Sequence, residues 1–424
     1  MAGKGFTMSS THHRRDTCRL CASRRLQMAL PMAATPVGDA YVPAEHLDKP
    51  QETYPLDLWL CRACGLAQLL EMVDPEILYV DYPYLTSISL GLPEHFRRYA
   101  KDVVDRVKPP PGALVVDIGS NDGSLLQAFA DLGMRVLGID PARDAGRLAN
   151  QRGVETLTTF FNGELARQLR EQRGAAAIIT ANNVFANIDN LDDLIAGVRT
   201  LLAPDGVFVF ETSYLGDVLE KTLVETIFHE HLSYFSVRPL RSFFQRHSME
   251  LIDVQRVPTK GGSIRGTVQL TGGGRPVRPS VDEVVAYEDR LGLHSPEIFG
   301  RLRATLDTVK ADLLRLLHDL KARGKRIAGY GASVGSVTLL YEFELRNLLD
   351  FLADDNPRKQ KTFSPGHHIP VLAPDAIYDR GVDALVILAW AYAEPIMRKH
   401  QKFLQNDGSF IVPLPAVRNV RKTS

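Results

Sequence analysis

All four cysteines of the chain fall within its first 64 residues, as two C-x2-C pairs formed by Cys18 with Cys21 and by Cys61 with Cys64. Two such pairs supply four thiolates, the ligand set of a tetrahedral structural zinc site. A pair of disulfides is the competing interpretation, but a cytosolic chain disfavours it. No fifth cysteine or histidine stands beside the pairs, so we expect a closed site in which zinc stabilises a segment with little core of its own.

The bulk composition is that of a soluble globular protein. The 424 residues are enough for two or three domains, and 45% are hydrophobic while 24% are charged. Lys+Arg and Asp+Glu both number 50, so no net field attracts nucleic acid or a membrane. The N-terminus carries no secretory signal and no long apolar run occurs. We therefore expect a cytoplasmic protein, monomeric, that binds a small molecule.

From about residue 91, strand and helix patterns alternate. Apolar Leu114–Ile118 predicts a strand, followed by a glycine turn, an amphipathic helix over 124–132 and a second strand that ends at Asp140. Further strands are expected over 175–184 and 206–212. Such alternation indicates βαβ units with a parallel sheet, and hence an α/β fold.

The second half repeats this alternation after two connecting features. The runs at 249–257 and 263–270 predict two strands joined by a short loop, in keeping with an antiparallel sheet edge. A long helix is expected from Ser295 to Gly324, because Ser295 suits an N-cap, Pro296 suits the first turn and Gly324 follows the end. Beyond it, "KRIAGYGASVGSVTLLYEF" predicts a second Rossmann-like unit.

The first glycine turn, "VVDIGSNDG", lacks the third glycine of the dinucleotide fingerprint. It matches better the variant that binds S-adenosylmethionine, in which Asp117 ends the strand, Gly119 lets the backbone approach the ligand and Gly123 opens the helix. Asp140, about 20 residues further on, would accept hydrogen bonds from ribose hydroxyls. "TTFF" follows the next strand and could flank an adenine with Phe160 and Phe161. NAD binding and a turn without a ligand remain alternatives.

The second glycine turn, "GYGASVGS" over 329–336, is less specific. It could hold a nucleotide phosphate on backbone N–H groups at a helix N-terminus. Close packing of helix against strand would need the same residues, and both interpretations stay open.

These motifs occur in the order seen in a known family. The four-cysteine segment, "VVDIGSNDGSLL", "ANNVFANIDNLDD", "ETIFHEHLSYFS", "KGGSIRG", "IAGYGASVGS" and "GSFIVPLP" together resemble the S-adenosylmethionine-dependent sugar C-methyltransferases, which methylate C3 of nucleotide-linked 4-keto-6-deoxysugars in deoxysugar biosynthesis. The resemblance spans Cys18 to Val417. It implies a zinc-binding N-terminal domain (1–90), a class I, Rossmann-like methyltransferase domain (91–256), hairpin and linker helices (257–324) and a Rossmann-like substrate-binding domain (325–424).

The resemblance also implies a catalytic role for "ETIFHEHLSYFS". Methylation beside a ketone requires a base for the C–H proton and a donor for the enolate oxygen. The family's base falls on His231, Glu230 would orient it, and Tyr82 would be the enolate donor. A histidine satisfied in the core at a helix edge is the other interpretation of this stretch.

Further site residues are expected from the same motifs. The cofactor would contact Asp117, Gly119, Asn121, Gly123, Asp140, Phe160, Phe161, Asn182 and Asn183. The substrate would contact Tyr84, Asn187, Phe228, Lys260, Gly262, Ser263, Arg265, Tyr330 and Ser333.

The chain also departs from the family pattern. Phe228 stands where a Tyr is usual, and Asn187 and Lys260 stand where His is common. A Lys often found in the second glycine turn is missing near Gly335. Because the cofactor and zinc residues are retained, we expect methyl transfer with an altered acceptor. A zinc-stapled binding protein without activity, and a dehydrogenase that binds NAD in its last domain, are the competing hypotheses.

Overall fold

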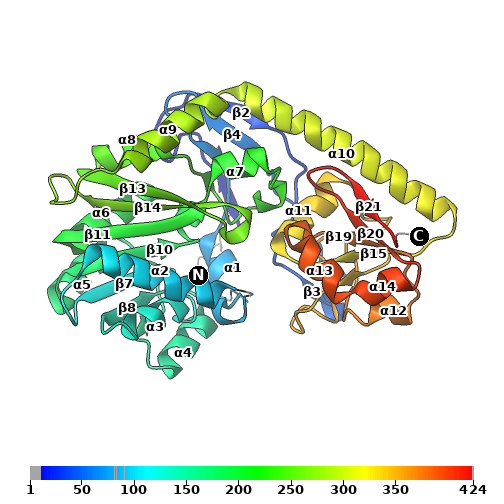
Figure 1. Cartoon of the computed structure of the whole chain (residues 1–424), viewed down its shortest axis with the longest axis horizontal. Coiled ribbons are helices and arrows are strands. Elements are labelled where there is room, and N and C mark those ends of the chain that lie inside the picture. Colours follow the sequence, from blue (N-terminus) through cyan, green and yellow to red (C-terminus); the bar gives the residue numbers. More distant parts are fainter. Residues whose placement is uncertain (1–10, 81, 83, 90, 423–424) are drawn as a thin grey trace, which may run out of the picture. The chain divides into compact units, whose positions relative to one another are not determined.

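The computed structural model describes residues 11–422 except 81, 83 and 90, and their contacts divide the chain into two compact units. The first contains the described residues up to Leu26, Cys61–Gly216 and Leu232–His294. The second contains Gln27–Leu60, Asp217–His231 and the chain from Ser295 onward. This division follows contacts and not chain order, so the four boundaries expected from the sequence stay predictions. Figure 1 traces the elements of both units.

The first unit is built on a seven-stranded sheet with helices on both faces. Its elements are β1 (His12–Arg14), β5 (Ala67–Leu69), β6 (Glu71–Val73), α1 (Pro75–Tyr79), η2 (Thr86–Ile88), α2 (Leu92–Val107), β7 (Leu114–Ile118), α3 (Ser124–Ala130), β8 (Arg135–Ile139), α4 (Arg143–Gln151), β9 (Thr156–Leu157), α5 (Gly163–Arg173), β10 (Ala176–Asn182), η3 (Phe185–Asn187), α6 (Leu191–Leu201), β11 (Leu202–Ser213), β12 (Ser233–Tyr234), α8 (Val237–Arg246), β13 (Met249–Val257), η5 (Thr259–Gly261), β14 (Ser263–Leu270) and α9 (Pro279–Leu291).

The strand order of this sheet is β13-β14-β11-β10-β7-β8-β9. β14 runs antiparallel to both of its neighbours, and the pairs from β11 to β9 are parallel. The predicted strands at 114–118, 249–257 and 263–270 are confirmed residue for residue, whereas β11 begins four residues before the predicted Gly206. The chain leaves β7 toward β8 and β9 and then returns to β10 on the other side. That reversal is a topological switch point, where α/β sheets bind ligands at the carboxyl ends of their strands.

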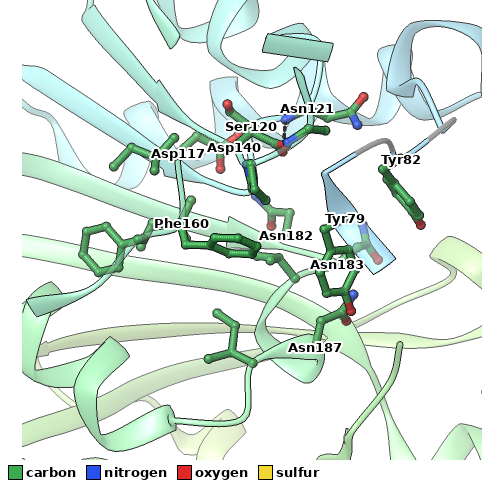
Figure 2. Close-up of a pocket in the computed structure, with 18 of the residues that line it drawn as sticks. Tyr79, Tyr82, Asp117, Ser120, Asn121, Asp140, Phe160, Asn182, Asn183 and Asn187 are labelled. Atoms are coloured by element: carbon green, nitrogen blue, oxygen red, sulfur yellow. Dashed lines mark hydrogen bonds between the residues drawn. The ribbon is translucent and has the colours of Figure 1, made fainter. Parts of the chain in front are cut away.

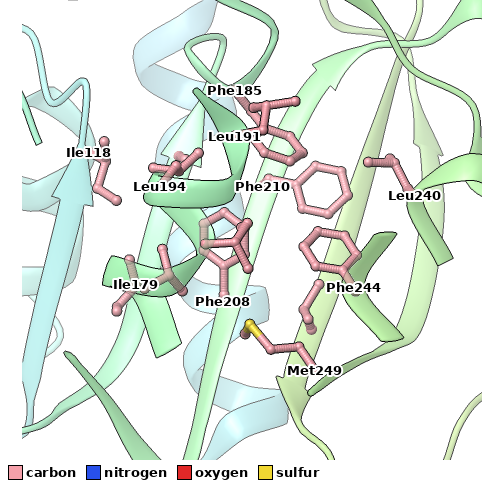
Figure 3. Packing of buried hydrophobic residues seen from close by; sticks show 14 of the residues in the cluster. Ile118, Ile179, Phe185, Leu191, Leu194, Phe208, Phe210, Leu240, Phe244 and Met249 are labelled. Atoms are coloured by element: carbon pink, nitrogen blue, oxygen red, sulfur yellow. The ribbon is translucent and has the colours of Figure 1, made fainter. Parts of the chain in front are cut away.

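Alternate residues of the central strands feed two separate cores. Val115 of β7 packs with α2, α3 and α4 on one face, while Leu114, Val116 and Ile118 pack with α5 and α6 on the other. On the second face, Phe185 lies 5.1 Å from Phe210 between ring centroids, and Phe244 of α8 stacks at 5.8 Å from Phe210 (Figure 3). Such aromatic packing buries much apolar surface and makes the sheet a rigid base for the loops above it.

A glycine in β14 makes this packing possible. A Cβ at Gly266 would lie 2.2 Å from the ring of Phe210. The strand motif "SIRGTVQL" therefore contains glycine because an aromatic ring occupies the space of its side chain.

The second unit carries a smaller parallel sheet. Its elements are β3 (Val42–Pro43), η1 (Ala44–His46), η4 (Val224–Thr226), α10 (Pro296–Ala322), β15 (Ile327–Tyr330), α11 (Val334–Glu342), β16 (Leu352–Ala353), β17 (Thr362–Phe363), β18 (Val371–Leu372), α12 (Ala376–Asp379), β19 (Ala384–Ile387), η6 (Trp390–Tyr392), α13 (Ala393–Lys399), α14 (Gln401–Gln405), β20 (Ser409–Val412) and β21 (Arg418–Val420). β2 (Leu26–Leu30), β4 (Leu58–Cys61) and α7 (Leu215–Glu220) cross the boundaries between the units in sequence.

This sheet has the order β18-β16-β15-β19-β20-β21, with β21 antiparallel at the edge. It confirms the predicted second Rossmann-like unit. The predicted long helix is also confirmed as α10, whose N-cap Ser295 accepts a hydrogen bond from the Glu297 N–H. Within the described residues, no helix is both long and apolar enough to span a bilayer.

Candidate active site

The four cysteines converge within the first unit. Their sulfur atoms all lie within 4.8 Å of one another, with 3.5 Å between Cys18 and Cys64 and 3.6 Å between Cys21 and Cys61. A tetrahedral zinc with Zn–S bonds of about 2.3 Å places its sulfurs about 3.8 Å apart, so the donor set fits this metal. Hydrogen bonding with Cys61 raises the pKa of Cys18 to about 12, and that of Cys64 is raised by hydrogen bonding with Cys18. Four crowded thiols need a cation before all of them ionise.

A pocket of about 380 Å³ opens at the carboxyl ends of β7, β8 and β10, at the topological switch point. Figure 2 shows the polar side chains of Asp117, Asp140, Asn182 and Asn183 gathered there with the glycine turn. The predicted site residues that line the pocket are Tyr82, Tyr84, Asp117, Gly119, Asn121, Asp140, Phe160, Phe161, Asn182, Asn183, Asn187 and Lys260.

The glycine turn owes its shape to one carboxylate. Asp140 accepts hydrogen bonds at 2.8 Å from the N–H groups of Asn121 and Ala142, so the end of β8 fixes the turn after β7. Gly119 has φ +75°, and a Cβ there would lie 2.8 Å from Val184. Asn121 and Asn183 also adopt positive φ, at +50° and +56°. Strained backbone of this kind concentrates at binding sites.

The charge of the pocket suits a cationic ligand. Burial raises the pKa of Asp117 to about 7, although Thr180 Oγ1 donates to this carboxylate at 2.6 Å. Burial also raises the pKa of Asp140. S-adenosylmethionine carries a sulfonium and an ammonium group, and either cation would stabilise these carboxylates in their charged form.

Polar groups with unused hydrogen-bonding capacity point to a polar ligand in the same pocket. The side-chain amide of Asn182 is buried and interacts with the Tyr99 side chain, but neither its oxygen nor its nitrogen forms a hydrogen bond of ordinary geometry with described residues. Asp140 can also accept further bonds, because each carboxylate oxygen has two lone pairs. The residues present therefore fit the hydroxyls and amino groups of S-adenosylmethionine.

The segment 84–87 is anchored on the glycine turn. Asn121 Oδ1 accepts from the Thr86 N–H at 2.8 Å, and Asn121 Nδ2 donates to Tyr84 O at 3.0 Å. Asp122 accepts from the Ser87 N–H at 2.9 Å. The side chain of Asn121 thus positions this segment, and with it Tyr84, at the pocket.

Asn187 and Lys260, which lie outside the glycine turn, also line the pocket. The Oδ1 of Asn187 is buried without a hydrogen-bond partner among the described residues. Lys260 has φ +50°, and its Nζ lies 5.5 Å from the centroid of the Tyr84 ring. The pocket therefore offers the amide of Asn187 and the ammonium group of Lys260 besides the carboxylates of Asp117 and Asp140.

Within the first unit, four predicted residues do not line this pocket: Gly123, Gly262, Ser263 and Arg265. Arg265 is buried and donates to Glu211 Oε2 from Nε at 3.1 Å and from Nη2 at 3.0 Å. His95 and Thr259 bind the other oxygen of Glu211 at 2.9 and 2.8 Å. The guanidinium thus neutralises a buried carboxylate next to the site, and the pKa of Glu211 stays low despite burial because His95 and Arg265 favour its charged form.

Phe228, Glu230 and His231 belong to the second unit. The carbonyl of Thr226 lies 3.0 Å from His231 Nδ1, so neutral His231 carries its proton on Nδ1 and has its lone pair on Nε2. The rings of Phe228 and His231 lie 4.1 Å apart. The first histidine of the same motif differs, because burial lowers the pKa of His229 to about 4 and its Nε2 binds Tyr54 O.

The first unit resumes directly after His231. The N–H of Leu232 donates to Ala186 O at 2.8 Å, and Ala186 precedes the pocket residue Asn187. The Leu232 carbonyl accepts from the Leu69 N–H at 3.0 Å. The backbone that follows His231 is therefore fixed to η3, which contains the pocket residue Asn187.

The remaining predicted residues, Tyr330 and Ser333, lie at the second glycine turn. Tyr330 donates to Asp355 at 2.9 Å and binds His400 Nε2 at 3.1 Å. Ser333 caps α11 in a reciprocal bond with Ser336. Both side chains hold the turn and its helix together.

Several pocket residues were not expected from the sequence. They include Tyr79, Ser120, Thr159, Asp189 and Asn190. Ser120, Thr159, Asp189 and Asn190 lie inside motifs located in the sequence, so their neighbours were a usable signal. The ion pairs of Asp189 with Arg15 and Arg19 gave no such signal, because these partners are distant in the chain.

Family comparisons cover the three parts of the chain. The model described as "Putative zinc binding domain" matches residues 18–79, the "Methyltransferase domain" matches 93–254, and the "C-methyltransferase C-terminal domain" matches 258–415.

Among curated proteins, the C-methyltransferase NovU of Streptomyces niveus is 33% identical over 96% of this chain and 98% of its own length. The ubiquinone biosynthesis O-methyltransferase of Burkholderia thailandensis is 25% identical over 35% of this chain and 68% of its own. Among solved structures, magnesium protoporphyrin IX methyltransferase from Synechocystis, with bound S-adenosylhomocysteine, matches at a TM-score of 0.33 and 16% identity, covering 42% of this chain and 83% of its own.

The fold, the pocket and the comparisons define a methyltransferase that depends on S-adenosylmethionine. Its class I domain follows the structural zinc site in the sequence. More narrowly, the chain belongs to the C-methyltransferase family, to which its full-length relative and its C-terminal domain both point. The expected enzyme class, cofactor and fold class are thus confirmed. The hypotheses of a dehydrogenase and of an inactive binding protein are set aside.

The zinc site can be tested with one ligand substitution. Cys64→Ser removes one of four thiolates. Because changes to residues that only support the ligands cost about 10- to 100-fold in metal affinity, we expect loss of a ligand itself to lower the affinity for zinc by more than about 100-fold. Zinc content after dialysis against a chelator measures this. The control Ala63→Ser introduces the same hydroxyl at an exposed neighbouring position and should retain one zinc per chain. Equal zinc retention in both variants would contradict the four-cysteine site.

The buried carboxyl of Asp117 makes stability depend on pH. Its folded pKa of about 7 lies above the unfolded value, so the unfolded state loses its proton first and stability falls as pH rises from about 4 to about 7. Without ligand, we expect Asp117→Asn to gain stability relative to the wild type across this window, by at most about 4 kcal/mol for three pKa units. Urea denaturation at a series of pH values measures the difference. A difference independent of pH would contradict the raised pKa.

Proposed function

We propose that the protein transfers a methyl group from S-adenosylmethionine to C3 of a nucleotide-linked 4-keto-6-deoxysugar, with His231 as the base. One observation carries the assignment of this base. The bonds of Leu232 to Ala186 and Leu69 fix the residue after His231 beside the loop that contains Asn187, which lines the cofactor pocket. The first residue after the "HEH" motif is thereby bonded to η3, which contains the pocket residue Asn187.

The tautomer of His231 suits proton removal. Because Nδ1 donates to the Thr226 carbonyl, Nε2 holds the lone pair that accepts a proton. Buried Glu230 is the adjacent carboxylate and would stabilise the imidazolium that forms. His229 is unsuited to the role, since burial holds its pKa near 4 and its Nε2 binds Tyr54.

The proposed reaction has two steps, proton removal and methyl transfer. The C3 proton passes to His231 Nε2, and the electron pair of the C–H bond moves into an enolate whose charge lies on the ketone oxygen. Tyr82, whose ring lies 5.9 Å from that of Tyr79, would donate a hydrogen bond to this oxygen. S-adenosylmethionine, held in the pocket by Asp140 and the glycine turn, would supply the methyl group that C3 accepts as the C–S bond breaks, and would be released as S-adenosylhomocysteine.

A second candidate is the same methyl transfer to a different carbon acid. Lys260 places an ammonium group in the pocket beside Tyr84, where the resembling family commonly has His. An ammonium group at this position would favour an acceptor that carries a carboxylate near its ketone. The two candidates share the base and differ in the acceptor.

Exchange of the acceptor proton tests the base. With S-adenosylhomocysteine bound in deuterated water, wild type should exchange the proton beside the ketone of a nucleotide-linked 4-keto-6-deoxysugar. His231→Ala should slow this by about 10² to 10⁴-fold, the usual contribution of a general base. NMR of the acceptor follows the loss of the proton signal.

His318→Ala, on the exposed face of α10, is the matched histidine control and should exchange at the wild-type rate. Exchange that persists in His231→Ala would refute the assignment of the base. If wild type exchanges only a keto acid with a nearby carboxylate, the second acceptor is the correct one.

A further inference from the structure

A buried arginine lies inside the zinc-binding segment. Arg19 stands between Cys18 and Cys21, and its side chain is 0% exposed. Its backbone N–H donates to Gln68 Oε1 at 3.1 Å, so the loop that holds two zinc ligands also fixes the base of this side chain.

The guanidinium reaches two loops at once. Nε donates to Asp189 Oδ1 at 2.9 Å, and Asp189 lines the cofactor pocket. Nη1 donates to the Leu232 carbonyl at 3.3 Å and also contacts the carbonyl of Leu69. Arg19 therefore connects the pocket loop after η3 with the residue that follows His231.

A stability role alone does not account for this arrangement. A buried ion pair gives little net stability compared with an apolar replacement of similar size. What a guanidinium provides, and an apolar side chain or a lysine does not, is a rigid fork with donors in fixed directions. Here those directions match a carboxylate on one loop and backbone carbonyls on another.

We propose that Arg19 is a positioning residue for methyl transfer, which holds the chain after His231 and the Asp189 loop in register and makes both depend on the zinc-bound segment. This inference rests on the proposed role of His231. In this proposal the zinc site serves catalysis by fixing the position of Arg19, and the metal does not contact the substrate.

The test compares Arg19→Gln with Arg15→Gln. Arg15 also donates to Asp189 Oδ1 at 2.9 Å but makes no described contact with Leu232, so it is a matched control for the loss of a positive charge at Asp189. Both variants are prepared with zinc, and hydrogen–deuterium exchange of backbone amides is followed by mass spectrometry in a peptide that contains Leu232. This readout needs no acceptor.

We expect the Leu232 amide to exchange at least about tenfold faster in Arg19→Gln and at the wild-type rate in Arg15→Gln, since only the former loses a hydrogen bond to the Leu232 carbonyl. The kcat should fall about 100-fold in Arg19→Gln, the effect of a displacement of about 1 Å, while KM for S-adenosylmethionine and zinc content stay near wild type. Arg19→Lys should recover only part of kcat.

Unchanged exchange in Arg19→Gln, or an equal effect in Arg15→Gln, would overturn the proposal. If Arg19→Gln does not fold, Asp189→Asn retains the guanidinium and removes one anchor, and it should raise exchange at Leu232 to a smaller extent; no change there would also overturn it. Because the exchange measurement is independent of the acceptor, a wild type that methylates no keto-sugar counts against the proposed function alone.

Discussion

The carboxylate of Asp140 is the interaction on which the pocket depends. By accepting the N–H groups of Asn121 and Ala142, it fixes the turn after β7 from the end of the neighbouring strand β8. Asn121 and Asp122 of this turn then hold segment 84–87 by hydrogen bonds. Together with the bonds of Gly119 and Ser120 to the Ile139 carbonyl, this buried acid fixes the turn that approaches the cofactor and the segment that carries Tyr84.

Carbon methylation adds a demand that this cofactor site does not meet by itself. A C–H proton must leave before the methyl arrives, so a base and an enolate donor have to be held at fixed distances from the sulfonium. In the proposed mechanism this demand falls on His231, and Leu232, directly after it, is held by backbone bonds with η3 and β5 and by the Arg19 side chain of the zinc-binding loop. The zinc site makes such a loop rigid enough to serve as an anchor.

Local patterns predicted the parts of the fold that depend on neighbours in the chain. Apolar runs located β7, β13 and β14, and capping residues located α10, because strand periodicity and helix ends are set by adjacent residues. The cysteine spacing located the metal site because two C-x2-C pairs supply the four thiolates that a structural zinc needs. The ion pairs of Arg19 with Asp189 and of Arg265 with Glu211 were not predicted, since each joins residues brought together only by tertiary folding. Arg265 was expected at the substrate, but its charge is matched by Glu211.

The most direct test of the account is the position of the transferred methyl group. The protein is incubated with S-adenosylmethionine carrying a ¹³C-labelled methyl and with a nucleotide-linked 4-keto-6-deoxysugar, and the product is examined by NMR. The account predicts a labelled methyl whose direct carbon–carbon coupling joins it to ring carbon C3. A labelled methyl bonded to oxygen, or no label on any keto acceptor while S-adenosylmethionine is bound, would contradict transfer to an enolised carbon.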